Sequence, residues 1–126
     1  MEQKPKSQVF PPNFPSSLAA KAFVNAREPA WRPLQGIEAV EWLGAHGYAV
    51  LGTEVWRPER DGIQSLPHFQ SVDRRTDETW NSFVSRSAAE TVDYLKTVSE
   101  ELARYGEAYV NLTWASEGEF QDLKAT

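Results

Sequence analysis

The longest regular pattern in the chain is a stripe of apolar residues in its second half. Its members recur at steps of three and four residues, and most charged residues fall on the opposite side, as in an amphipathic helix on a core. Gly106 follows the stripe and is a typical helix terminator. The pattern predicts a long helix over residues 79–105, capped by Thr76 or Asp77.

Two further helices are predicted in the first half. Apolar residues at helical spacing run through residues 33–47, where Pro33 suits a first helical turn and Gly47 suits a helix end. A shorter helix is expected over residues 16–28. It should stop there, because Pro29 restricts the backbone of the residue before it.

Other segments alternate as strands do. Residues 48–56 are apolar at first and alternate towards their end, with Gly52 indicating a bulge or a close backbone approach. Residues 108–114 alternate throughout. A turn at Asp61-Gly62 leads into a short return strand over residues 63–66, prolines bound this hairpin, and residues 68–78 are expected to form a polar loop. The two most apolar strands, 48–56 and 108–114, should pair.

The order of these elements predicts an α+β fold, with helices packed on a small, mainly antiparallel β-sheet and one long helix in the C-terminal half. The 126 residues suit one domain, expected over residues 16–116. Residues 1–15 contain four prolines and should form an extended strap or a mobile segment. Residues 117–126 should be an acidic tail that frays.

The composition argues against several kinds of binding partner and binding site. The net charge is −5, and the second half alone carries twelve acidic residues against six basic ones. Nucleic-acid binding requires a basic surface, so no nucleic-acid partner is expected. No apolar run approaches the roughly 20 residues of a membrane span, and no signal core follows the N-terminus, which favours the cytoplasm. With no Cys and two His, we expect no metal site and no cofactor.

Sequence motifs for catalysis are missing: there is no nucleophile elbow, no phosphate-binding loop and no dinucleotide-binding turn. The best alternative of this kind is a small hydrolase-like enzyme that uses Glu54 with His68 or Asp73. Glu54 also fits an exposed position on an edge strand with no chemical role. A structural or scaffold domain is a third possibility. We predict a protein that is not an enzyme.

Large aromatic residues beside acidic ones suggest a binding surface instead. Trp56 and Trp114 lie at or near the ends of predicted strands, where an indole can reach a partner. Residues two apart in a strand share a face, so Glu54 and Trp56 should point outward together if Val55 faces the helices. With Asp73 from the loop before the long helix, these residues are predicted to form one contact surface.

Several segments together carry a family likeness. They are Trp31, the helix that ends in His46-Gly47, the strand YAVLGTEVW at 48–56, and the helix start TWNSFVSRS at 79–87 followed by Tyr94-Leu95. Over residues 31–114 the chain resembles the immunity protein 40 family of bacterial proteins, proposed to neutralise a cognate toxin of a polymorphic toxin system. Where the family tends to have Gly-Asp, this chain has Thr53-Glu54, which keeps the charge. Val72 stands near a position where the family often carries a further Trp.

This resemblance implies a non-catalytic inhibitor whose partner is a cognate toxin protein. An acidic binder would suit a basic toxin, because opposite charges speed association. The predicted toxin-binding residues are then Glu54, Trp56, Asp73 and Trp114. We expect a monomer or a weak dimer.

Overall fold

The computed structural model describes residues 9–125. Its elements are, in chain order, α1 (Ser16–Lys21), β1 (Phe23–Asn25), β2 (Glu28–Trp31), α2 (Pro33–Ala45), β3 (Ala49–Glu59), β4 (Gly62–Ser71), α3 (Trp80–Leu102), the 3-10 turn η1 (Ala103–Tyr105), β5 (Tyr109–Ala115) and α4 (Glu117–Ala125). The predicted α+β class, with its long helix in the C-terminal half, is confirmed.

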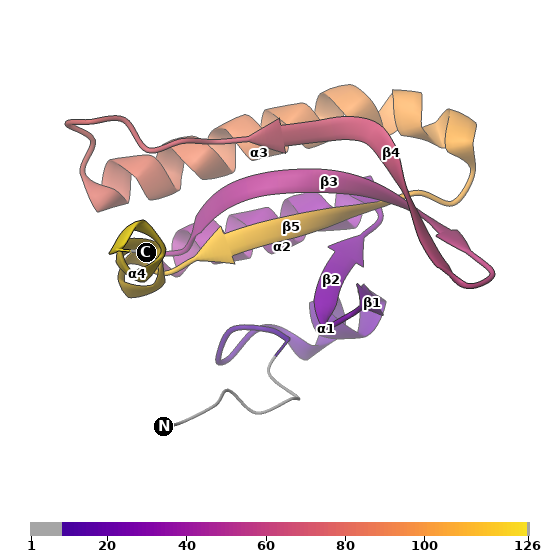
Figure 1. Cartoon of the computed structure of the whole chain (residues 1–126), viewed down its shortest axis with the longest axis horizontal. Helices are drawn as coiled ribbons and strands as arrows, with labels where there is room; N and C mark the ends of the chain where they lie inside the picture. The colour runs from indigo at the N-terminus through magenta and orange to yellow at the C-terminus, as the bar shows by residue number, and fades with distance from the viewer. Residues whose placement is uncertain (1–8, 126) are drawn as a thin grey trace.

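The five strands form one antiparallel sheet in the order β1-β2-β5-β3-β4. The last strand of the chain, β5, lies in the centre, where Val110 pairs with Val55 of β3. The predicted pairing of the two most apolar strands is therefore confirmed. Helices α2 and α3 lie side by side behind the sheet, and no described helix covers the front of β3, β4 and the middle of β5 (Figure 1).

The main core fills the space between the helices and the sheet. It brings together buried side chains from α2, α3, β3 and β5, including Leu43, Leu95, Val55 and Val110. A second, smaller cluster surrounds Phe83 at the start of α3. Within residues 9–125, no helix has the length and apolar character that a bilayer span requires.

The aromatic residues of the N-terminal segment pack against the main core. Phe10 stacks on Phe14 with ring centroids 5.1 Å apart, and both rings lie against Trp31 at 6.1 and 5.9 Å. Phe14 also meets Trp42 of α2 edge-on at 5.0 Å. The part of the predicted strap that the structure describes is thus docked, while residues 1–8 lie outside the described residues.

The predicted helix over residues 16–28 is wrong in its second half. Helix α1 ends at Lys21, and the next residues form the hairpin β1–β2. Its turn places Ala26 and Arg27 at positive φ, 51° and 65°, which alanine and arginine seldom adopt. The hairpin is held from outside, because β2 pairs with β5 from the far end of the chain. The spacing of apolar residues within 16–28 does not predict this pairing with a strand from the far end of the chain.

Both prolines expected to bound the central hairpin lie inside strands instead. The pairing of β3 with β5 ends at Trp56, so Pro58 has a described neighbouring strand, β4, on one side only. Proline has no N–H to donate, and it can be accommodated where its nitrogen faces the side without a partner strand. Pro67 falls in a bulge, where two residues of β4 are passed over between the Leu66–Val55 and Phe69–Glu54 pairs. The hairpin therefore extends to Ser71, into what was predicted as a polar loop.

Helix ends and the C-terminal segment also differ from expectation. The cap of α3 is Thr79, whose hydroxyl accepts the Ser82 N–H at 3.1 Å, and not Thr76 or Asp77. In place of a frayed acidic tail, α4 begins at a capping box. There the Ser116 hydroxyl accepts the Glu119 N–H and the Glu119 carboxylate accepts the Ser116 N–H.

Candidate protein-binding face

Cross-strand pairing decides which side chains lie on the uncovered side of the sheet. Paired residues of an antiparallel sheet point to the same side. Val55 and Val110 form a pair and both belong to the core beneath the helices. Their neighbours along the strands, Glu54 and Asn111, are also paired and therefore point to the opposite side. We call this uncovered side of β3, β4 and β5 the open face.

Strand β4 adds an aromatic side chain to the open face. Phe69 pairs with Glu54, so the two lie next to each other, and 74% of Phe69 is exposed. The Ser65 hydroxyl of the same strand donates a hydrogen bond to Oε1 of Glu54. The open face thus presents a phenyl ring and a carboxylate side by side.

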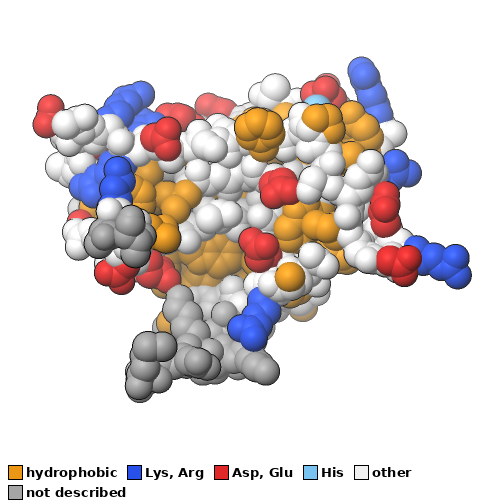
Figure 2. All heavy atoms as spheres, in the orientation of Figure 1, with side chains coloured by type: hydrophobic (Ala, Val, Ile, Leu, Met, Phe, Trp, Pro, Cys, Tyr) orange, Lys and Arg blue, Asp and Glu red, His pale blue; other side chains and the backbone are white. Residues whose placement is uncertain are grey.

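A groove runs along the open face beside these residues. Its volume is about 570 Å³, and it is lined by Gly52, Thr53, Glu54, Ser65, Leu66, Pro67, Phe69, Gln70, Ser71, Asn111 and Thr113. Figure 2 looks on to this side of the molecule, where acidic and hydrophobic side chains lie among uncharged atoms and the Lys and Arg side chains lie mostly towards the periphery.

The floor of the groove is made rigid by backbone packing. The predicted irregularity at Gly52 is confirmed, because the pairing of β3 with β5 shifts between Val50 and Gly52. A Cβ at position 52 would lie 2.9 Å from the carbonyl oxygen of Gln70, so β3 and β4 approach more closely here than a side chain allows. Beside it Asn111 is 3% exposed, and its Nδ2 donates to the Pro29 carbonyl at 2.9 Å.

Trp56 shares the side of Glu54, as its spacing predicts, but its expected outward exposure is wrong. The indole is only 3% exposed. It pairs with Tyr109, whose ring packs against Phe23 of β1 at 5.2 Å, so aromatic side chains gather at this end of the face. Trp56 therefore offers little surface to a partner.

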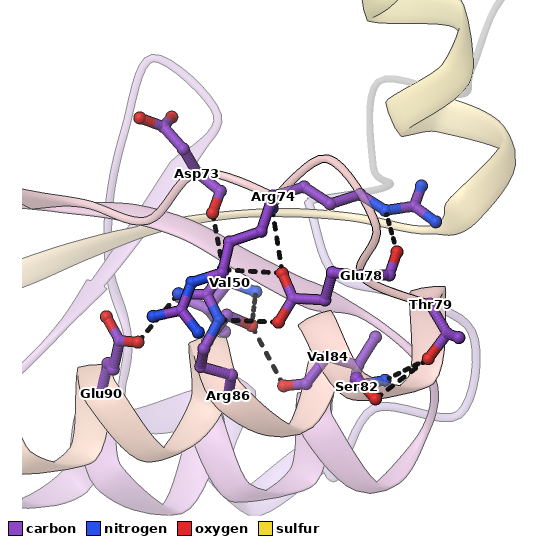
Figure 3. A network of polar contacts seen from close by, with 11 residues as sticks. Val50, Asp73, Arg74, Glu78, Thr79, Ser82, Val84, Arg86 and Glu90 are labelled. Atoms are coloured by element: carbon purple, nitrogen blue, oxygen red, sulfur yellow. Dashed lines mark hydrogen bonds and ion pairs between the residues drawn. The ribbon is translucent and has the colours of Figure 1, made fainter.

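The other two predicted contact residues lie apart from Glu54. Trp114 pairs with Val50 and packs against the main core, on the helix side of the sheet. Asp73 lies in the connection from β4 to α3, with an exposed side chain that points away from its neighbours (Figure 3). The four residues do not form one surface. Side chains alternate between the two sides of a strand, which places Glu54 and Trp114 on opposite sides of the sheet, and Asp73 lies outside the strands.

The residues of the hydrolase-like alternative are not brought together either. His68 turns towards η1, where its ring meets Tyr105 edge-on at 5.8 Å and its Nε2 lies 3.4 Å from the Tyr105 hydroxyl. Glu54 instead contacts Ser65 on the open face. Among residues 9–125, no group of three or more acidic or His side chains is placed to hold a metal ion.

Phe69 is the residue that sequence reasoning missed. It falls in the stretch predicted as a polar loop, since Pro67 was expected to end the strand. The sequence offers one weak indication of its role, an isolated aromatic residue between polar neighbours. This pattern fits the exposed side of a strand as well as it fits a loop.

A charged network holds the connection that leads from β4 to α3. Arg86 of α3 binds both oxygens of Glu78, with Nε–Oε2 at 2.7 Å and Nη2–Oε1 at 2.8 Å, and its Nη2 also donates to the Asp73 carbonyl at 2.6 Å (Figure 3). Nη1 pairs with Glu90 one turn later, at 2.8 Å. One guanidinium thereby ties the loop to the helix through three hydrogen bonds, two to Glu78 and one to Asp73.

This network predicts a dependence of stability on acid pH. The hydrogen bonds from Arg86 lower the pKa of Glu78 from 4.5 to about 2, although burial opposes the shift. A pKa that is lower in the folded state stabilises the fold above the unfolded pKa, and this contribution is lost as the pH falls from about 4.5 to about 2. Glu78→Gln should therefore be less stable than the wild type at pH 7, and the difference should shrink over that interval.

Urea midpoints measured from pH 7 to pH 2 check this prediction. Glu59→Gln, which neutralises an exposed carboxylate of β3 outside the network, is the matched control. A gap between wild type and Glu78→Gln that stays constant down to pH 2 would contradict the assignment.

Comparison with known proteins gives one match. The family model described as Immunity protein 40 matches residues 21–113, well over half of the chain. The matched region runs from the end of α1 to β5 and includes the groove and the Arg86 network. No significant match was found among curated proteins or among solved structures.

Proposed function

Because the chain belongs to the immunity protein 40 family, we propose that it binds a cognate toxin and neutralises it as a non-catalytic inhibitor. The observation that carries the proposal is the family match over residues 21–113. The open face supports it, because an exposed Phe69 beside Glu54 on a rigid sheet is the kind of anchor that protein interfaces use.

The charge of the chain supports a basic toxin as the partner. A net charge of −5 favours fast capture of a positively charged protein, and the steering weakens as salt is added. Of the residues predicted from the sequence to contact the toxin, we retain Glu54 as a central contact. Asp73 adds negative charge in the connection after β4, while Trp56 and Trp114 pack against neighbouring residues and are not proposed to contact the toxin. We expect the protein to act in the cytoplasm as a monomer or a weak dimer.

Stoichiometry tests the proposal. The chain is titrated into the toxin domain encoded by the neighbouring reading frame, and residual toxicity and heat of binding are followed. A binding inhibitor should silence the toxin at about one equivalent, since each molecule occupies one partner. Inactivation of many toxin molecules by one immunity molecule would instead indicate an enzyme. Absence of both binding and protection would reject the proposed function.

A further inference from the structure

We infer that the groove of the open face receives an arginine side chain of the toxin, held between the Glu54 carboxylate and the Phe69 ring. The inference rests on the proposed function and deepens it by naming the chemistry of the contact. It follows from three features of the groove: an incompletely paired carboxylate, an exposed aromatic ring, and a neutral polar trough between them.

The first feature is the carboxylate. The Ser65 hydroxyl donates to Oε1 of Glu54, and among the described residues no partner faces Oε2. Among the described residues, Arg86 forms ion pairs with Glu78 and Glu90, and no cation is paired with Glu54. Glu54 is also the only charged residue among those that line the groove. A cation entering here would meet one negative charge and no competing positive one.

The second feature is the ring beside it. Phe69 is 74% exposed, and its pairing with Glu54 sets it against the carboxylate. An arginine guanidinium is planar, so it can stack on a phenyl ring while its N–H groups bind a carboxylate. A lysine ammonium is a compact, strongly hydrated charge and gains less from such a ring. The pair of side chains therefore selects arginine over lysine.

The third feature is the trough itself. Gly52 pairs with Ser71 on one side and with Thr113 on the other, and all three residues line the groove, so no side chain stands between the two flanking residues. Both flanking residues are exposed and end in hydroxyl groups that can accept hydrogen bonds. A guanidinium carries five N–H donors, more than one carboxylate can accept. The hydroxyls supply acceptors for the remainder.

Binding measurements with an inactive form of the toxin domain test the inference. Glu54→Gln and Phe69→Ala should each weaken binding at least about tenfold, because both remove an interaction that a buried guanidinium needs. Leu34→Ala is the matched control: it removes an equally exposed apolar side chain, 68% accessible, from the start of α2, outside the groove. This control should change the affinity less than about twofold. Circular dichroism confirms that each variant is folded.

A double-mutant cycle identifies the partner side chain. Each arginine of the toxin domain is changed to lysine and tested against the wild type and Glu54→Gln. For the inserted arginine, the loss seen with the wild type should largely vanish with Glu54→Gln, since the two groups share one interaction.

The outcomes separate the two proposals. Unchanged affinity of Glu54→Gln and Phe69→Ala, with tight binding by the wild type, would overturn the groove assignment and leave the proposed function standing. Weakened binding without coupling to any toxin arginine would overturn arginine as the group recognised. No binding by the wild type would reject the proposed function, and this inference with it.

Discussion

Replacement of Trp31 by alanine is expected to lower the free energy of unfolding by about 3–5 kcal/mol, the range for deleting a large buried aromatic side chain. The indole is fully buried at the end of β2, where Phe10 and Phe14 cover it. Its Nε1 donates to the Leu18 carbonyl of α1 at 2.9 Å. One side chain thus joins the N-terminal segment, the first helix and the sheet.

The loss would be a large part of the roughly 5–15 kcal/mol that stabilises a typical domain. Urea unfolding followed by far-UV circular dichroism measures it, because this signal does not depend on the removed fluorophore. Trp31→Phe separates the two contributions: it keeps most of the ring but leaves the Leu18 carbonyl without its donor, so its loss should be intermediate. A cost below about 1 kcal/mol for Trp31→Ala would mean that the N-terminal segment does not hold this site closed.

Replacement of Ser87 by alanine is expected to cost about 1–3 kcal/mol, the penalty for leaving a buried donor unpaired. The Ser87 hydroxyl accepts the Val50 N–H at 3.1 Å and donates to the Val84 carbonyl at 3.0 Å. Val50 lies where the pairing of β3 with β5 shifts, and both Val50 and Ser87 are fully buried. The helix therefore supplies the partner that the bulged strand lacks.

Ser85→Ala is the matched control for this substitution. Ser85 lies in the same helix, but its side chain is exposed, so the same chemical change there alters helix propensity without a buried partner. The difference between the urea midpoints of the two variants isolates the hydrogen bonds. Equal effects at positions 85 and 87 would show that Val50 finds another acceptor.

The segment TWNSFVSRS at 79–87, which carried the family resemblance, acquires physical roles in the structure. Thr79 caps α3, and Trp80 donates from Nε1 to the Gly47 carbonyl at 3.0 Å. Arg86 ties the preceding loop to the helix, while Ser87 binds the bulged strand. The motif stabilises one end of the sheet, so the resemblance to the family rests here on residues with structural roles.

The sequence alone determined the features that depend on near neighbours along the chain. Helices α2 and α3 follow from apolar residues three and four apart, and the glycines after them, Gly47 and Gly106, adopt the positive φ that ends a helix. The alternation of 48–56 and 108–114, with their apolar content, correctly predicted that these two strands pair. Period two also placed Glu54 and Trp56 on the same side.

Only the tertiary structure decided which of those side chains a partner can reach. Trp56 is buried beside Tyr109 of β5, whose ring in turn packs on Phe23 of the β1–β2 hairpin. Phe69 is exposed because a bulge at Pro67 lets β4 continue along β3. The exposure of such a side chain depends on segments that are distant in sequence and come into contact only in the folded protein. The periodicity of one strand therefore shows which side a residue takes, while contacts between distant segments determine whether that side is covered.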